Sequence, residues 1–308
     1  MTTGISYVSI AVADMQQVRE LWIEQFGLIV IEHRLGPDAE LAKLWGIAPA
    51  QISEQLLLAS PSAETGKLHF VELADPDSAV RQNAAPYDLG AKNLDVNCTD
   101  LPGCVEKLKK SGYEFRSEIV EYEIEGLEIR EIQMHAHDGL NVAFIEVLGP
   151  KFKTSFTKQG YAALTSFVVI VEDTVSEANF YKHNFDFDEI MHHKLSGPDI
   201  ETAIGLPSGT ALHMRLCGKE NNMFGRMELI SYEGLTGKNR FELAQPPATG
   251  ILRCGFIVNS LDEMAAKADI NKQLVVGPIS IETILGNGQV LKIESPAGLK
   301  IDILELNK

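Results

Sequence analysis

Four segments of the chain are apolar or alternate between apolar and polar residues, and an amphipathic stretch follows each of them. They cover residues 5–12, 93–98, 166–171 and 253–258. Short runs of this kind are typical of β-strands with at least one buried face. Each segment is followed by a residue whose side-chain oxygen can accept a hydrogen bond from a backbone N–H in the first turn of a helix. These residues are Asp14, Asp100, Asp173 and Ser260. The pattern therefore predicts four strand–helix units.

The units repeat at half the length of the chain. Asp14 and Asp173 lie 159 positions apart, and the aromatic residues of the helix after Asp14 align with aromatic residues after Asp173. Further strand-like runs follow each helix, so each unit is predicted to be βαβββ. Self-similarity at a fixed spacing indicates a repeat architecture. We expect an N-terminal pair of modules in residues 1–150 (about 5–73 and 91–148) and a C-terminal pair in 151–308 (about 163–231 and 251–306).

The charge balance narrows the choice of partners. The 308 residues carry 27 Lys and Arg against 43 Asp and Glu, a formal net charge of −16. A chain this acidic repels phosphate backbones and anionic lipids, so neither nucleic acid nor membrane is expected as a partner. A small molecule is expected instead, and exposed sheet edges are compatible with a homodimer or larger homo-oligomer.

The cysteines and the N-terminal segment indicate in which cellular compartment the protein is expected. Cys98, Cys104, Cys217 and Cys254 form no CxxC pair, and four cysteines in a chain of this length do not indicate a disulfide framework. Neither a signal peptide nor an apolar run of about 20 residues is recognisable. These features predict a cytoplasmic protein.

Local motifs carry a family resemblance. The aromatic-rich helix Trp22-Ile23-Glu24-Gln25-Phe26-Gly27, and strands ending in Val71-Glu72-Leu73 or Met227-Glu228-Leu229, resemble the vicinal oxygen chelate superfamily. That superfamily includes glyoxalases, bleomycin resistance proteins and extradiol dioxygenases. The resemblance implies an α+β fold in which four βαβββ modules form two cup-shaped mixed β-sheets, with helices packed outside. The modules could pair in chain order (1+2, 3+4) or crossed (1+4, 2+3).

The resemblance also implies where a metal would be held. Members of the superfamily usually place a His or Gln seven residues before the cap and a Glu on the last strand of the module. The first set of positions reads Tyr7, Asn93, Ser166 and Arg253, and the second reads Glu72, Ala143, Glu228 and Asp302. No pairing of modules yields two histidines and one carboxylate, the set suited to non-haem iron. No cofactor is therefore predicted; one divalent ion (Fe, Mn, Zn or Ni) is the alternative, with Glu228, His135 and His137 as candidate ligands.

Four charged residues at these positions are candidate catalytic groups. Arg253 and Asp302 are predicted to form an ion pair where a metal would otherwise lie. The Arg253 guanidinium could bind a carboxylate or enolate of a ligand, or the pair could only brace the sheet. Glu72 and Glu228 could each act as a general base, because a partly apolar cup raises the pKa of a carboxyl group.

Polar residues on the strands facing the cup are candidate substrate contacts. With a period of two, Asn93 and Asp95 share one face of their strand, and the other face packs on helices. Tyr7, Ser166 and His213 are expected to line a cup in the same way, although a solvated cup without a function is the alternative.

Two functions remain open from the sequence. The first is an enzyme of the glyoxalase/dioxygenase superfamily that acts on a small oxygenated organic molecule, by isomerase, lyase or ring-cleavage chemistry. The second is a metal-free protein that binds or sequesters a small molecule, as bleomycin resistance proteins do. The missing histidines favour binding, whereas the four-module length and the polar strand favour an enzyme.

Overall fold

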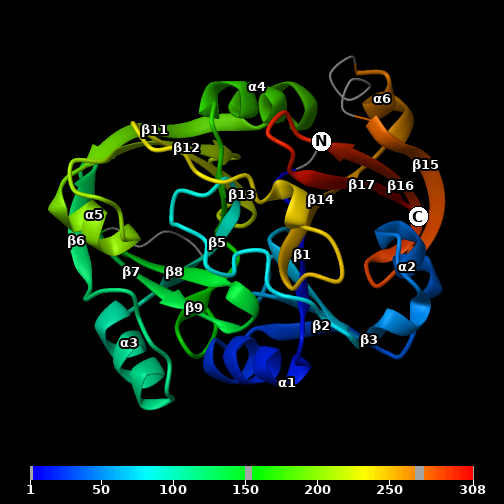
Figure 1. Ribbon diagram of the computed structural model, residues 1–308, viewed down its shortest axis with the longest axis horizontal. Coiled ribbons are helices and arrows are strands. Elements are labelled where there is room, and N and C mark those ends of the chain that lie inside the picture. Colours follow the sequence, from blue (N-terminus) through cyan, green and yellow to red (C-terminus); the bar gives the residue numbers. More distant parts are fainter. Residues whose placement is uncertain (1–2, 150–154, 268–273, 308) are drawn as a thin grey trace.

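The protein consists of four βαβββ modules arranged in two curled, mixed β-sheets. The computed structural model describes residues 3–149, 155–267 and 274–307. The two sheets lie side by side in Figure 1, with the first and last modules on the right and the two middle modules on the left. The α+β fold with two cup-shaped sheets is confirmed.

The first sheet joins modules one and four, and we call its concave side the 1/4 cup. Its strand order is β15-β16-β17-β14-β1-β4-β3-β2. The strands are β1 (Tyr7–Val12), β2 (Ile29–Leu35), β3 (Ile52–Ala59), β4 (Lys67–Leu73), β14 (Gly250–Val258), β15 (Leu274–Thr283), β16 (Gly286–Glu294) and β17 (Lys300–Leu306). The helices of these modules are α1 (Met15–Val18), continued by a π-helix over Arg19–Gln25, α2 (Ala39–Trp45) and α6 (Leu261–Ala265).

The second sheet joins modules two and three, and we call its concave side the 2/3 cup. Its strand order is β11-β12-β13-β10-β5-β8-β7-β6, with the short β9 (Tyr161–Ala162) paired to β5. The strands are β5 (Gly90–Cys98), β6 (Val120–Ile124), β7 (Leu127–His135), β8 (Asn141–Leu148), β10 (Ser166–Ile170), β11 (Asp188–Ser196), β12 (Ala211–Gly218) and β13 (Arg226–Tyr232). The helices are α3 (Leu101–Lys110), α4 (Thr174–Phe185) and α5 (Pro198–Ile204), and 3₁₀ turns cover Pro49–Gln51, His137–Gly139 and Phe241–Leu243.

The modules pair in the crossed arrangement, one of the two that the sequence left open. In each sheet the first strands of two modules run antiparallel at the centre. Tyr7 lies opposite Gly255 in the 1/4 cup, and Leu94 lies opposite Phe167 in the 2/3 cup. Each first strand also runs parallel to the last strand of its own module, as β1 does to β4. Each half of the chain therefore contributes one module to each sheet.

The helix caps predicted from the sequence are confirmed. Each side-chain oxygen accepts from a backbone N–H in the first turn of its helix, which satisfies a donor without an intrahelical partner. The acceptors are Asp14 for α1, Asp100 for α3, Asp173 for α4 and Ser260 for α6.

The largest apolar core lies on the outer, helix-covered faces of both sheets and joins them. The ring of Phe26, from module one, packs edge-on against Phe144 of module two, with 5.6 Å between ring centroids. The ring of Phe185, from module three, stacks on Phe256 of module four at 3.9 Å. Packed aromatic pairs stabilise a core beyond the effect of their buried area. The helices of one sheet are thereby packed on strands of the other.

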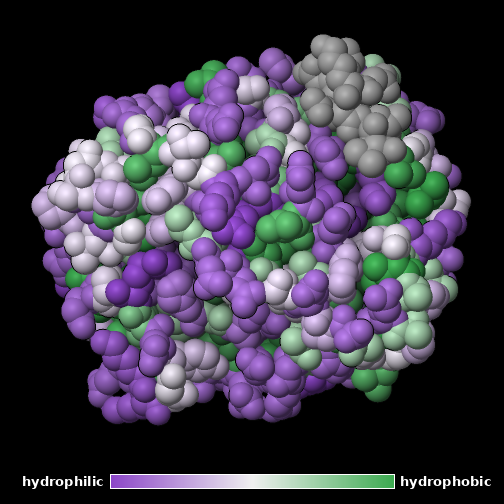
Figure 2. Space-filling model, in the orientation of Figure 1, coloured by the Kyte–Doolittle hydropathy of each residue, from purple (hydrophilic) through white to green (hydrophobic). Residues whose placement is uncertain are grey.

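The surface reflects the acidic composition. Figure 2 shows one face that is mostly hydrophilic, with hydrophobic residues in small scattered groups. Among the described residues, no helix is long and apolar enough to cross a membrane.

Candidate functional site

In the part of the chain that the structure describes, large side chains of α2 pack into one cup, whereas the equivalent side chains of α5 leave a cavity in the other. In the 1/4 cup, Leu44 and Trp45 of α2 are buried against Tyr7, Val71 and other apolar residues of the sheet. The residues 159 positions later, on α5, are Ala203 and Ile204, which pack over the 2/3 cup. Smaller residues at equivalent positions leave space that the larger ones occupy.

The resulting cavity has a volume of about 170 Å³ and lies between the sheet and α5. Its walls are mainly apolar and come from β6, β7, β11, α5 and β12: Ile124, Leu127, Ile129, Met191, Leu195, Ile200, Ala203, Ile204, Leu212, Met214 and Leu216. The polar lining includes Lys92, Asn93, Asp95, Glu131, Gln133, Ser166 and Glu228. A mainly apolar hollow with a few converging polar groups is the usual form of a small-molecule site.

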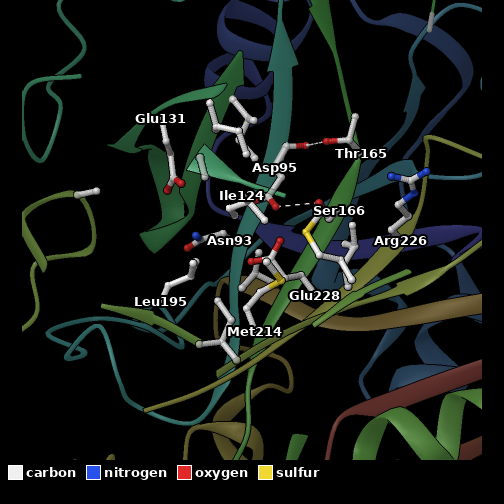
Figure 3. A pocket seen from close by; sticks show the side chains of 18 of the residues that line it. Asn93, Asp95, Ile124, Glu131, Thr165, Ser166, Leu195, Met214, Arg226 and Glu228 are labelled. Atoms are coloured by element: carbon white, nitrogen blue, oxygen red, sulfur yellow. Dashed lines mark hydrogen bonds between the residues drawn. The ribbon is translucent and has the colours of Figure 1, made fainter. Parts of the chain in front are cut away.

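Two carboxyl groups, Asp95 of β5 and Glu228 of β13, face each other in this cavity (Figure 3). The Ser166 hydroxyl donates to Oδ2 of Asp95 at 2.8 Å, while Oδ1 of Asp95 has no hydrogen-bond partner among the described residues. Burial, and next the charge of Glu228, raise the pKa of Asp95 well above its usual value. Burial, and next the charge of Glu131, raise the pKa of Glu228 to about 7. Both carboxyl groups are therefore harder to ionise than free carboxyl groups, and their proximity disfavours ionisation of both at once.

A hydrogen-bonded network fixes the polar residues beside this pair. The side-chain amide of Asn141 donates to Oδ1 of Asn93 at 2.6 Å and to Oε1 of Gln133 at 3.0 Å. Gln133 in turn donates to Glu131, which also accepts from the hydroxyl of Tyr122 at 2.5 Å. These hydrogen bonds restrict the side chains to one arrangement, although Oδ1 of Asn141 has no partner among the described residues.

The predicted candidates fall into two separate groups. Asn93, Asp95, Ser166 and Glu228 come together in the 2/3 cup. Tyr7, Arg253 and Asp302 come together in the filled 1/4 cup.

The predicted ion pair between Arg253 and Asp302 is confirmed. Nη1 of Arg253 lies 3.3 Å from Oδ1 of Asp302, and both side chains are buried. The guanidinium also lies over the indole ring of Trp45, 5.4 Å from its centroid. Because Trp45 and its apolar neighbours fill the cup around the pair, these contacts suit a structural brace.

Glu72 does not lie in a cup. Its carboxylate accepts from the backbone N–H of Met15 at 2.9 Å, on the outer face beneath α1. The residue equivalent to Glu228 is His69, since Ser9 lies opposite His69 in β4 as Val168 does opposite Glu228 in β13. Glu72 stands three positions further along the strand, and an odd shift turns a side chain to the other face.

His69 fills the cup position that Glu72 was expected to occupy. Its ring nitrogens lie 3.1 Å from the Ser9 hydroxyl and 3.1 Å from Oε1 of Gln55. Burial lowers the pKa of His69 to about 3, so its imidazole is neutral.

The other candidate histidines also lie outside the cavity. His213 shares the outer face of β12 with Arg215, which contacts α4, and its ring pairs with Glu233 at 2.8 Å. In His137 one ring nitrogen accepts from the indole of Trp22 and the other contacts Asp138. His135 is exposed at the end of β7. The i, i+2 spacing of His135 and His137 therefore does not make a shared site.

The residues present do not fit the metal that the resemblance implies. In the 2/3 cup the four equivalent positions are Asn93, Ala143, Ser166 and Glu228, and in the 1/4 cup they are Tyr7, His69, Arg253 and Asp302. Alanine offers no donor atom, and the guanidinium repels a cation. Over the described ranges, no group of three His, Cys, Asp or Glu residues is placed to hold a metal ion.

Sequence reasoning missed several polar residues of the site, among them Lys92, Glu131 and Gln133. Asn93 lies opposite Val168, but Ala91 lies opposite Val169, so Lys92 is the extra residue of a β-bulge in β5. The bulge interrupts the alternation and turns Lys92 toward the cavity. The repeat contains a clue to this residue, because Lys92 aligns with Leu252. Leu252 occupies the corresponding bulge of β14 and faces the 1/4 cup.

The raised pKa of Glu228 predicts a pH dependence of stability. A folded-state pKa of about 7, above the value in the unfolded chain, means that the folded protein binds more protons between these two values. The contribution of Glu228 to stability is therefore present at acidic pH and lost as the pH rises through 7. Urea denaturation at several pH values from 5 to 8 gives the free energy of unfolding as a function of pH. As the pH rises toward 7, this free energy should fall less steeply in Glu228→Gln than in the wild type, by at most about 1.4 kcal/mol per pH unit. Identical slopes in the two proteins would contradict the raised pKa.

Comparisons with known proteins find similarity at the level of the fold. No family model matches the sequence, and no curated protein matches it. Glyoxalase I from Zea mays aligns with a TM-score of 0.67 and 14% identity, over 98% of this chain and 92% of that one. A Bacillus subtilis protein with a provisional dioxygenase name aligns with a TM-score of 0.57 and 11% identity, over 100% of this chain and 86% of that one. This chain has the fold of the vicinal oxygen chelate superfamily.

Proposed function

We propose that the 2/3 cup binds a small, largely apolar organic molecule with a carbonyl oxygen, and that Asp95 and Glu228 move a proton on it. The observation that carries the proposal is the facing carboxyl pair in the hollow cup. Two carboxyl groups whose environments separate their protonation states are typical of an acid and a base acting together.

Each group has a distinct task. Glu228, with a pKa of about 7, has enough carboxylate at neutral pH to remove a proton next to a carbonyl group. Asp95 accepts from the Ser166 hydroxyl, and its raised pKa favours the protonated form, which can donate to the carbonyl oxygen on which negative charge develops. These tasks suit isomerase or lyase chemistry.

The apolar wall defines the rest of the ligand. Leucine, isoleucine and methionine side chains surround the carboxyl pair on the side of α5 and β12. Such a wall binds hydrocarbon by removing it from water and excludes water from the carboxyl pair. A hydrophilic sugar or a phosphate ester would leave its polar groups unpaired there.

The same wall supports a second candidate function, a protein that binds a small molecule without transforming it. The misfit between the cup residues and the superfamily's metal favours this alternative. It differs from the first in one testable respect, because a binding protein leaves the protons of its ligand in place.

Proton exchange distinguishes the two functions. The protein is incubated in D₂O with a panel of small ketones and hydroxyketones, and loss of the proton next to the carbonyl is followed by NMR. The control is Ala203→Leu/Ile204→Trp, which moves the residues of α2 onto α5 and should fill the cavity without unfolding the sheet. We expect exchange with the wild type only. Binding without exchange would favour the second function, and equal exchange by both proteins would contradict the proposed site.

We also propose a compartment and a partner. The four cysteines are free and buried, which supports a reducing environment such as the cytoplasm. The proposed partner is the small-molecule ligand of the 2/3 cup.

A further inference from the structure

Lys92 is a buried lysine that has no carboxylate partner among the described residues. Its side chain lines the 2/3 cavity, and the residue is only 3% exposed. Within the described part of the chain Lys92 forms no ion pair, and its hydrogen bond is to the hydroxyl of Tyr232 at 3.4 Å. Buried lysines are normally paired with acids, because an isolated charge is costly to remove from water.

The surroundings of Lys92 favour the neutral amine. Burial, followed by the charges of Arg81 and Arg116, lowers the pKa of Lys92 to about 7, against a smaller opposing effect of Glu131 and Glu228. A lysine that is desolvated in an apolar pocket, or lies near other cations, is an activated nucleophile.

The fold itself does not need an amine at this position. In the 1/4 cup the equivalent bulge of β14 carries Leu252, which is fully buried among apolar side chains. The bulge therefore accommodates an apolar residue. Lys92 replaces it in the cup that also holds a cavity and the carboxyl pair of Asp95 and Glu228.

We propose that the ε-amino group of Lys92 is a nucleophile that forms an imine with an aldehyde or ketone bound in the 2/3 cup. The inference rests on the proposed ligand cavity and names its ligand class, but it does not require proton removal by Glu228. The amine nitrogen bonds to the carbonyl carbon, and the electron pair of the C=O π bond moves to oxygen, which takes up a proton. Loss of one water molecule from this carbinolamine gives the imine, so no oxidant or reductant is consumed.

Reductive trapping tests the proposal. The full chain is incubated at pH 7 with a low concentration of benzaldehyde and sodium cyanoborohydride, which reduces an imine to a stable benzylamine. Peptide mass spectrometry then locates the benzyl group. A neutral amine at pH 7 should make Lys92 react about 10 to 100 times faster than an exposed lysine such as Lys182.

Three variants separate the outcomes. Lys92→Leu, which copies the leucine found at the equivalent position 252, should fold and lose the fast adduct, and Lys182→Leu should keep it. The filled-cavity variant Ala203→Leu/Ile204→Trp should also lose it. Modification of Lys92 no faster than that of Lys182, or a fast adduct at Lys92 that survives filling of the cavity, would overturn the proposal.

The proposed proton transfer by Glu228 can be tested independently of imine formation at Lys92. Glu228→Gln leaves Lys92 in place, so the fast adduct should persist in this variant even where proton exchange is lost. Proton exchange by the wild type without a fast adduct at Lys92 would overturn the imine and leave the acid–base function intact.

Discussion

Replacing Asp302 by alanine is expected to lower the free energy of unfolding by about 3 to 5 kcal/mol, because the substitution leaves Arg253 buried without its carboxylate. The guanidinium packs on the face of the Trp45 ring, inside the 1/4 cup. Urea denaturation followed by tryptophan fluorescence measures the effect.

The double substitution Arg253→Met/Asp302→Leu is the matched control. It removes both charges and keeps apolar volume, so its stability should lie within about 1 to 2 kcal/mol of the wild type. If Asp302→Ala costs less than about 1 kcal/mol, or if the double variant is the less stable of the two, the pair is not the brace that its burial indicates.

Replacing Glu228 by glutamine is expected to slow exchange of the proton next to the ligand carbonyl by about 10² to 10⁴ fold. Glutamine has nearly the same shape but cannot accept the proton, so ligand affinity should change little. Proton exchange followed by NMR in D₂O gives the rate, and a titration of the same ketone gives the affinity.

The control for this prediction is Glu72→Gln. Glu72 was an equally good candidate base in the sequence, but it accepts from the N–H of Met15 on the outer face of its strand. Its replacement should weaken the start of α1 and leave the exchange rate unchanged. A larger loss of exchange in Glu72→Gln than in Glu228→Gln would reverse the assignment.

Features with short-range causes could be predicted from the sequence. Asp14 and Asp173 cap their helices because the side chain and the free N–H groups lie within three residues of each other. The polar face of Asn93 and Asp95 follows in the same way from the pleat of a single strand. The repeat then extended these local predictions to the whole fold.

Features that depend on pairing between strands could not be predicted. Lys92 reaches the cavity only because β5 and β10 slip by one residue where they meet, and no run of residues within β5 specifies that slip. The motif match assigned Glu72 to the position that His69 occupies, because a short motif does not contain the register of β4 against β1. Which cup is hollow depended on Ala203 and Ile204, whose small size matters only once α5 lies over the sheet.

The crossed pairing has a consequence for the order of folding during synthesis. The 2/3 sheet is built from one continuous stretch, residues 90–232, and can close when the ribosome has released that stretch. In the 1/4 sheet, Tyr7 pairs with Gly255, so β1 cannot complete its pairing until the last module has left the ribosome. Pairing between such distant segments is intrinsically slow. The ligand-sized cavity therefore belongs to the part of the molecule that can mature first on the ribosome, and the enclosed ion pair of Arg253 and Asp302 to the part that matures last.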